Sequence, residues 1–198
     1  MAKQYDRNYF ERWYRDPAIG GPARLARKVA LAVSTAEYYL ERPLRTVLDI
    51  GCGEGAWRAP LLKLRPKARY LGFDSSTYAI KRFGPRRNLH LARFGDFEHL
   101  RPCPPVDLLV CSDVLHYLPT RELDRGLPAL AELCGGVAFL ETFTRADGID
   151  GDTEEFRARS AAFYRGRFTA IGLQPLGSHL WLSPALAGAT AALELPGA

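Results

Sequence analysis

The stretch Val47-Leu48-Asp49-Ile50-Gly51-Cys52-Gly53-Glu54-Gly55 determines which fold we expect. Together with Thr46, its first half is a short run of mainly branched apolar residues around one acid, as in a buried strand. Its second half places glycines at alternate positions, and glycine is favoured where the backbone turns at positive φ or lies against a ligand. A strand that runs into such a loop and then into a helix forms a ligand crevice at the carboxyl edge of a parallel sheet. Asp49 lies at the mouth of this crevice, where a cationic or hydroxyl-bearing ligand would give a buried carboxylate its partner.

The glycine loop alone is compatible with two classes of ligand. Residues 51–56 fit the dinucleotide-binding pattern G-x-G-x-x-[GA], and Asp74 stands 23 positions after Gly51, near the place of the acid that binds a ribose. S-adenosylmethionine is the alternative ligand, and other parts of the chain distinguish the two.

Four stretches, in chain order and at plausible spacings, resemble the motifs of the class I (Rossmann-like) S-adenosylmethionine-dependent methyltransferases. They lie between about residues 45 and 145. The dinucleotide interpretation gives no reason for Asp49 or for the pair Gly95-Asp96. The four stretches are Asp49-x-Gly51-x-Gly53-x-Gly55 (the first motif), Tyr70–Ser76 (the second strand and its acid), Gly95-Asp96-Phe97 (the third motif) and Val106–Leu118 (the fourth strand and the loop that faces the substrate).

This resemblance and the alternation of strands with helices predict an α/β fold. We expect a seven-stranded, mostly parallel Rossmann-like sheet in the order 3-2-1-4-5-7-6, with helices on both faces and a C-terminal antiparallel strand pair. We expect a single methyltransferase domain over residues 1–198, with an N-terminal helical cap (1–44) and a Rossmann-like core (45–198). The expected strands are 46–50, 69–73, 89–93, 106–111 and 137–141, with the closing pair in 173–182 and 189–195. The expected helices are 4–16, 23–41, a short one that ends at about 64, 77–83, 121–133 and 153–170. Gly84-Pro85 is expected to end the helix 77–83, and Gly135-Gly136 the helix 121–133. Asp152 or Thr153 is expected to cap the last helix.

The resemblance implies S-adenosylmethionine as cofactor, with S-adenosylhomocysteine as its product. It implies that Asp49 orients the amino group of the methionine part, that Asp74 accepts hydrogen bonds from the ribose, and that Asp96 accepts one from the adenine. Each acid also fits a structural role, as a helix cap or in a turn. The expected cofactor-binding residues are Asp49, Gly51, Gly53, Asp74, Ser75, Asp96, Phe97 (through its amide and its ring) and Ser112.

Methyl transfer from a sulfonium is an in-line displacement, so the protein must mainly align donor and acceptor and exclude water. Some acceptors also need a general base. His116, in the substrate-facing loop, is the first candidate because the pKa of histidine is ordinarily near neutral; it equally fits a packed turn. Glu141, at the end of the fifth expected strand, is the second candidate. Aromatic residues that could form walls for the acceptor are Tyr9, Trp13, Phe143 and Tyr164.

Two departures from the sequence patterns of known methyltransferases narrow the chemical class of the methyl acceptor. Methyltransferases of amino groups in bases or glutamine usually carry Asn/Asp-Pro-Pro-aromatic after the fourth strand, where this chain has Cys111-Ser112-Asp113-Val114. The metal-dependent catechol type places Asp-Asn after the fifth strand, where this chain has Glu141-Thr142. We therefore expect metal-independent methylation of an O or N atom of a small molecule, with S-methylation less favoured. Open alternatives are an RNA or protein acceptor, an NAD(P)-dependent oxidoreductase, and a noncatalytic nucleoside-binding protein.

Composition limits the number of domains, the cellular location and the partners that we expect. The 198 residues suffice for one domain with a core, and 47% hydrophobic with 25% charged residues is ordinary for a globular protein. No apolar run is long enough for a membrane span and no secretory signal precedes the first helix, so we expect no membrane partner and a cytoplasmic location. The four cysteines are scattered, which predicts neither a zinc site nor disulfides. The net charge of +5 is dispersed, which disfavours nucleic acid but leaves an anionic substrate open. A homodimer is also left open.

Overall fold

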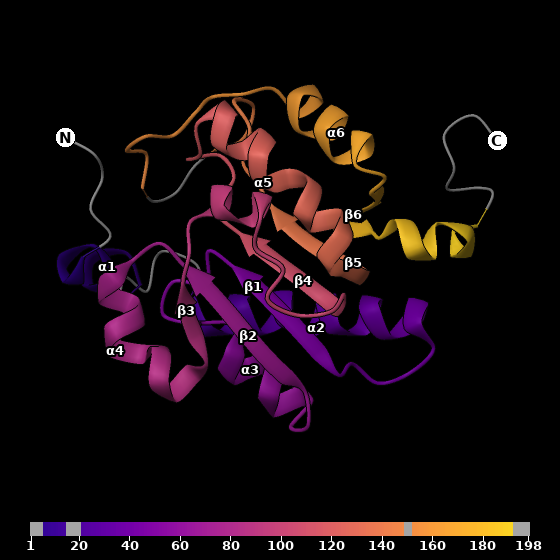
Figure 1. Cartoon of the computed structure of the whole chain (residues 1–198), viewed down its shortest axis with the longest axis horizontal. Coiled ribbons are helices and arrows are strands. Elements are labelled where there is room, and N and C mark those ends of the chain that lie inside the picture. The colour runs from indigo at the N-terminus through magenta and orange to yellow at the C-terminus, as the bar shows by residue number, and fades with distance from the viewer. Residues whose placement is uncertain (1–5, 15–20, 149–151, 192–198) are drawn as a thin grey trace.

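The computed structural model describes residues 6–14, 21–148 and 152–191, and Figure 1 shows them around one central sheet. The seven strands follow the order β3-β2-β1-β4-β5-β7-β6. β1 to β5 run parallel, whereas β7 is antiparallel to both β5 and β6. The predicted fold class and strand order are therefore confirmed. The strands are β1 (Thr46–Ile50), β2 (Arg69–Asp74), β3 (Leu89–Leu91), β4 (Val106–Ser112), β5 (Cys134–Glu141), β6 (Gln174–Gly177) and β7 (Leu180–Leu182).

Helices cover both faces of this sheet, as expected. One face packs against α2 and α3, with side chains of α4 at its edge, and the other packs against α5, α6 and η1. The helical elements are α1 (Arg7–Tyr14), α2 (Gly21–Leu40), α3 (Arg58–Leu64), α4 (Thr77–Arg87), η1 (Phe94–Glu98), α5 (Thr120–Leu133), α6 (Ala161–Ala170) and η2 (Pro184–Ala189). Among the helices in these described ranges, none is long and apolar enough to cross a membrane.

The central strands β1 and β4 are buried on both faces, which explains their nearly continuous apolar sequence. Successive side chains of a strand point to opposite faces. Leu109 and Cys111 of β4 accordingly lie in the cluster under α5, while Leu108 and Val110 lie in the cluster under α2. This double burial fixes the register of the strands, and with it the position of every residue at their carboxyl ends.

Some predicted boundaries were wrong because glycine and proline were given too much weight as breakers. Gly84-Pro85 does not end α4, which continues until Asn88 adopts φ 57 and donates its backbone N–H to the Gly84 carbonyl. Gly135-Gly136 does not end the preceding helix in a loop but lies inside β5. A Cβ atom on Gly136 would lie 2.2 Å from the Asp107 carbonyl oxygen. Glycine is used there because β5 approaches β4 closely.

The last third of the chain differs more from prediction. Helix α6 begins after Ser160, whose hydroxyl accepts a hydrogen bond from the Phe163 amide, so neither Asp152 nor Thr153 caps it. Both closing strands lie within the predicted run 173–182, joined by a turn in which Ser178 and His179 have positive φ. The predicted strand 189–195 was wrong for 189–191, because Ala189 is the last residue of η2 and residues 190–191 form no strand. The rest of the predicted strand lies outside the described residues. Residues 4–5 and 15–16 of the first predicted helix also lie outside them.

Candidate functional site

The glycine loop follows β1 directly and has the backbone that its sequence predicted. Gly51, Gly53 and Gly55 all have positive φ, of 77°, 54° and 74°. The amides of Gly51 and Cys52 both donate to the Phe73 carbonyl at the end of β2, over 2.8 and 3.0 Å. A Cβ atom on Gly51 would lie 2.3 Å from a methyl carbon of Val114. The loop is thus held between the ends of two neighbouring strands in a shape that residues with side chains rarely adopt.

Asp74, the last residue of β2, lies against this loop. Its carboxylate accepts hydrogen bonds from the Gly53 amide over 2.7 Å and from the Ser76 amide over 2.8 Å. Burial raises the pKa of Asp74, and these amide hydrogen bonds oppose the rise. The N-cap of α4 is Ser76, whose hydroxyl accepts from the Ala79 amide, so Asp74 is not needed in that role. Its carboxylate therefore stands at the edge of the crevice, beside the exposed Ser75.

Asp49 is more deeply placed than Asp74. It is 1% exposed, and the phenol of Tyr70 on β2 donates a hydrogen bond to its Oδ2 over 2.5 Å. Burial raises the pKa of Asp49 to about 7, although the hydrogen bond from Tyr70 limits the rise. A cationic ligand group arriving at the mouth of the crevice would favour the ionised carboxylate.

The predicted adenine motif, Gly95-Asp96-Phe97, lies in η1, shortly after β3. Asp96 is exposed, and its carboxylate accepts from the Arg93 amide over 2.8 Å. Phe97 is wholly buried, with its ring edge-on to Phe73 at a centroid distance of 5.5 Å. The ring of Phe97 is thus part of the core, which leaves its backbone as the group that could contact an adenine.

A buried ion pair joins the ends of β4 and β5 to helix α2. The Lys28 ammonium lies 2.5 Å from Glu141 Oε1, and the Ser112 hydroxyl donates to Glu141 Oε2 over 2.6 Å. The side chain of Glu141 is 3% exposed and that of Lys28 is 28% exposed. Burial opposes ionisation of Glu141, but the hydrogen bonds from Lys28 and Ser112 hold its pKa below the ordinary value. Glu141 is therefore an ionised carboxylate whose two oxygens both have partners.

His116 follows β4 and is fully enclosed, with no exposed surface. Its Nδ1 accepts a hydrogen bond from the Phe143 amide over 3.3 Å, and its ring packs against Tyr117, Phe143 and Phe156. Its Nε2 lies 3.1 Å from Asp113 Oδ1, yet the two are not aligned for a hydrogen bond, and the described residues offer Nε2 no other partner. In this arrangement the imidazole ring is enclosed by packed side chains.

Comparison with known proteins agrees with this geometry. Residues 48–136, which run from β1 into β5, match the family model of a methyltransferase domain, Methyltransf_12. The matched segment, which is less than half of the chain, is thus similar to a methyltransferase domain. Asp49 and the glycine loop stand at the end of β1, and Asp74 stands at the end of the neighbouring strand β2.

Two curated relatives and one solved structure show how far the similarity extends. The chain is 36% identical over 76 residues to a trans-aconitate 2-methyltransferase of Azoarcus sp. (strain BH72), covering 37% of this chain and 29% of that protein. It is 37% identical over 81 residues to a trans-aconitate 2-methyltransferase of Deinococcus radiodurans, covering 40% and 30%. The chain thus spans about a third of the length of these relatives. A SAM-dependent methyltransferase from Archaeoglobus fulgidus shares the fold, with a TM-score of 0.62, 17% identity, and coverage of 84% of this chain and 73% of that one.

S-adenosylmethionine fits the residues at the centre of this sheet. The glycine loop presents backbone without side chains, so a ligand can approach it closely. Asp74 offers a carboxylate for ribose hydroxyls, and Asp49 offers one that a positive amino group would keep ionised. Bound there, the cofactor supplies a methyl group activated by a positively charged sulfur.

The predicted acceptor walls are not all brought together. Phe143 is half-buried beside His116. Tyr164 is buried in the core beneath α6, with its hydroxyl 3.3 Å from an Arg159 nitrogen, and does not line an open site. Tyr9 and Trp13 are half-buried on α1. Figure 1 shows α1 beside α4, where Phe10 meets Tyr78 at a ring distance of 5.8 Å, so these rings belong to the ribose side of the sheet.

Sequence reasoning missed two residues of the site, Lys28 and Tyr70. A signal for Lys28 was present, since it stands one and two turns before Ala32 and Ala36, which are both fully buried. A lysine on the buried face of a helix needs an acid partner. Tyr70 gave no such signal, because an aromatic residue is common in any strand.

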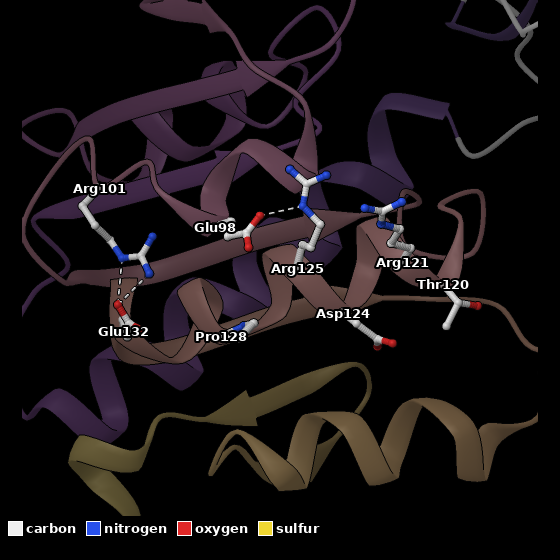
Figure 2. Close-up of a pocket in the computed structure, with 8 residues that line it drawn as sticks. All are labelled: Glu98, Arg101, Thr120, Arg121, Asp124, Arg125, Pro128 and Glu132. Atoms are coloured by element: carbon white, nitrogen blue, oxygen red, sulfur yellow. Dashed lines mark hydrogen bonds and ion pairs between the residues drawn. The ribbon is translucent and has the colours of Figure 1, made fainter.

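A separate hollow of about 700 Å³ lies over η1 and α5, on the outer surface of the domain (Figure 2). Two ion pairs line it: Arg125 binds Glu98 over 2.6 Å, and Arg101 binds Glu132 over 2.7 Å. The lining residues are Glu98, Arg101, Thr120, Arg121, Asp124, Arg125, Pro128 and Glu132. They come from a helix surface rather than from strand ends, so this hollow is distinct from the crevice at the glycine loop.

Proposed function

We propose that this chain is an active methyltransferase that transfers the methyl group of S-adenosylmethionine to a carboxylate oxygen of a small organic acid, without a metal. The observation that carries the proposal is the ion pair between Lys28 and Glu141 at the ends of β4 and β5. It holds an ammonium group, at the end of a side chain that is 28% exposed, on the side of the sheet where the loop after β4 would face an acceptor. The names of the matched relatives, which refer to a tricarboxylic acid, support the same acceptor class.

The states of the two predicted bases agree with such an acceptor. His116 is enclosed, and both oxygens of Glu141 have partners. A carboxylic acid has an ordinary pKa near 4 and is already ionised at neutral pH, so its methylation needs no general base. The carboxylate oxygen forms its bond to the methyl carbon while the bond from carbon to sulfur breaks, and the electron pair stays on sulfur. No proton moves, and alignment of the two reactants is the main requirement.

The overall charge of the chain also supports an anionic acceptor. The net charge is +5, and a surplus of positive groups raises the local concentration of small anions around the protein. An amine or phenol acceptor would gain nothing from this field and would need a base.

The experiment is a methylation assay of the purified chain with labelled S-adenosylmethionine. The acceptors are trans-aconitate, other di- and tricarboxylic acids, a phenol and a primary amine, each with and without a chelator. We expect label in the acids only, unchanged by the chelator, as an ester that mild alkali releases as methanol. Label in the phenol or the amine alone would refute the carboxylate acceptor, and loss of activity with the chelator would refute metal independence.

A further inference from the structure

The buried ion pair at the acceptor side also bears on which acids the site would accept, an inference that rests on the proposed function. We propose that the Lys28 ammonium binds a carboxylate of the acceptor other than the one that is methylated, and so selects acids with at least two carboxylates. Glu141 and Ser112 act as positioning residues that hold the ammonium in place.

The first argument is the geometry of Lys28. It lies on the sheet side of α2, and its ammonium reaches the end of β5. An ammonium group has three N–H donors. In the described part of the chain its one ion-pair partner is Glu141, and 28% of its side chain remains exposed. Glu141 accepts one of the three hydrogen bonds that the ammonium can donate, so the ammonium keeps donors for a ligand at this edge of the sheet.

The second argument is the cost of the pair. Removing two charges from water costs several kcal/mol for each ion, and a pair is often no more stable than apolar residues of the same size. Glu141 is 3% exposed, and Ser112 occupies its second oxygen. The Glu141 carboxylate is thus fixed in one orientation. It in turn holds the Lys28 ammonium in one position, whereas the ammonium of a surface lysine is mobile.

The third argument is the charge of the surroundings. His179, in the turn between β6 and β7, lies close enough for its positive form to help lower the pKa of Glu141, after the larger effects of burial, Lys28 and Ser112. The backbone of the same residue is anchored to β5, since the His179 carbonyl accepts from the Leu140 amide over 2.8 Å. The nearby carboxylate of Asp147 is bonded to the amide and hydroxyl of Thr144, both over 2.8 Å. A lysine and a histidine side chain therefore lie at the end of β5, where one buried acid is already paired.

The bound carboxylate and the methylated carboxylate must be different groups. A hydrogen bond from an ammonium withdraws electron density from an oxygen and weakens it as a nucleophile. A second carboxylate on the same molecule can bind Lys28 with no such loss and align the first one. This predicts a strong preference for polycarboxylic over monocarboxylic acids.

The variant to test is Lys28→Met, which removes the charge and keeps most of the apolar stem. Its matched control is Arg27→Met, the same loss of charge at the exposed neighbouring position of α2. With trans-aconitate as probe, we expect Lys28→Met to raise KM roughly 10- to 100-fold, as for a lost charge-to-charge hydrogen bond, and to change kcat by less than about threefold. Arg27→Met should match the wild type, Lys28→Arg should recover part of the loss, and the affinity of all three for S-adenosylhomocysteine should be unchanged. An unchanged KM in Lys28→Met would overturn the inference.

Two further measurements extend the test. The first does not depend on turnover, and the second does not depend on a variant. Calorimetric titration of trans-aconitate into protein saturated with S-adenosylhomocysteine reports binding alone. Binding that Lys28→Met loses and Arg27→Met keeps would support the inference even if no acid were methylated, in which case only the proposed function fails. In the wild type, partial methyl esters of trans-aconitate, which carry fewer charges, should bind at least tenfold more weakly for each charge lost. Equal affinity for the acid and its esters would contradict the role of Lys28 without any variant.

Discussion

The phenol of Tyr70 donates a hydrogen bond of 2.5 Å to the buried carboxylate of Asp49, from the strand next to it in the sheet. Within the described part of the chain this is the single side-chain hydrogen bond that Asp49 makes, and the residue is 1% exposed. One hydrogen bond is little compensation for a buried charge. The pKa of Asp49 near 7 follows from that imbalance, since burial raises it more than Tyr70 lowers it.

The affinity for S-adenosylhomocysteine should therefore depend on pH around neutrality. The positive amino group of the ligand favours ionised Asp49, so protonation of Asp49 competes with binding. With a pKa of about 7 in the free protein, affinity should rise about tenfold between pH 6 and pH 8. Calorimetric titration across this range measures it.

Two variants separate the contribution of Asp49 from that of Asp74, whose pKa burial also raises. Asp49→Asn should bind more weakly at pH 8 and show a flatter pH dependence than the wild type. Tyr70→Phe should shift the rise in affinity to higher pH, because it removes the group that lowers the pKa of Asp49. A profile that stays the same in both variants would mean that Asp49 does not contact the amino group.

The same acid predicts how the ligand-free protein responds to pH. A carboxyl whose folded pKa lies above its unfolded value near 4 contributes stability below that value, and this contribution is lost as pH rises to about 7. Asp49→Asn should thus raise the melting temperature of the ligand-free protein more at pH 8 than at pH 5.

Gly51→Ala should abolish cofactor binding. Gly51 has φ 77°, and a Cβ atom there would lie 2.3 Å from Val114, so the loop must move. We expect a loss of at least 100-fold in S-adenosylhomocysteine affinity and about 2 kcal/mol or more in stability, from strain and overpacking. Calorimetry and denaturant unfolding measure the two effects.

The control for this variant is Gly166→Ala. Gly166 lies within α6, and nothing stands within 4 Å of the place for its Cβ atom. Alanine is preferred to glycine inside a helix by about 1 kcal/mol, so this change should stabilise the protein and leave the affinity unaltered. If Gly51→Ala behaved in the same way, the loop would not be held as the structure shows.

Asp107 should stabilise the fold from the opposite edge of the sheet. At the amino end of β4, its carboxylate binds the Arg42 guanidinium over 2.6 and 3.0 Å and accepts from the Arg45 amide over 2.6 Å. Burial opposes its ionisation, but these hydrogen bonds hold the pKa of Asp107 below the ordinary value. Its stability contribution is present above the unfolded pKa and is lost as pH falls through the lower folded pKa.

Asp107→Asn should therefore cost about 1–3 kcal/mol at pH 7, and less as the pH approaches the folded pKa of Asp107. Denaturant unfolding at several pH values tests this. Asp124→Asn, which breaks the exposed pair with Arg167, is the control and should cost less than about 0.5 kcal/mol. Equal costs for the two variants would show that the partners of Asp107 add nothing beyond a surface pair.

Sequence reasoning succeeded where local pattern and topology suffice. The apolar run of β1 and the glycines after it predicted the loop, and the strand order placed Asp49, Asp74 and Glu141 at one edge. It failed where distant segments decide. The acids Glu154 and Glu155, directly after Thr153, favoured a helix start. The backbone there instead lies along the loop after β4, since the Arg157 amide donates to the His116 carbonyl over 2.9 Å. The partner of Lys28 is 113 positions away in sequence, and that of Tyr70 is 21 positions away, so neither pairing could be read from a local pattern.

The final prediction concerns His116, which the sequence favoured as a general base and the structure encloses. Loss of a general base typically costs 10²- to 10⁴-fold in rate. If the acceptor is a carboxylate, His116→Asn should lower kcat by less than about tenfold, because no proton is transferred. It should still lower the melting temperature, since Nδ1 accepts from the Phe143 amide and the ring fills a space between Tyr117 and Phe156. Steady-state kinetics with trans-aconitate, together with S-adenosylhomocysteine titration to verify the cofactor site, distinguish the two roles. A fall of more than 100-fold in kcat with cofactor affinity intact would restore His116 as the base, and would require its ring to become accessible during turnover.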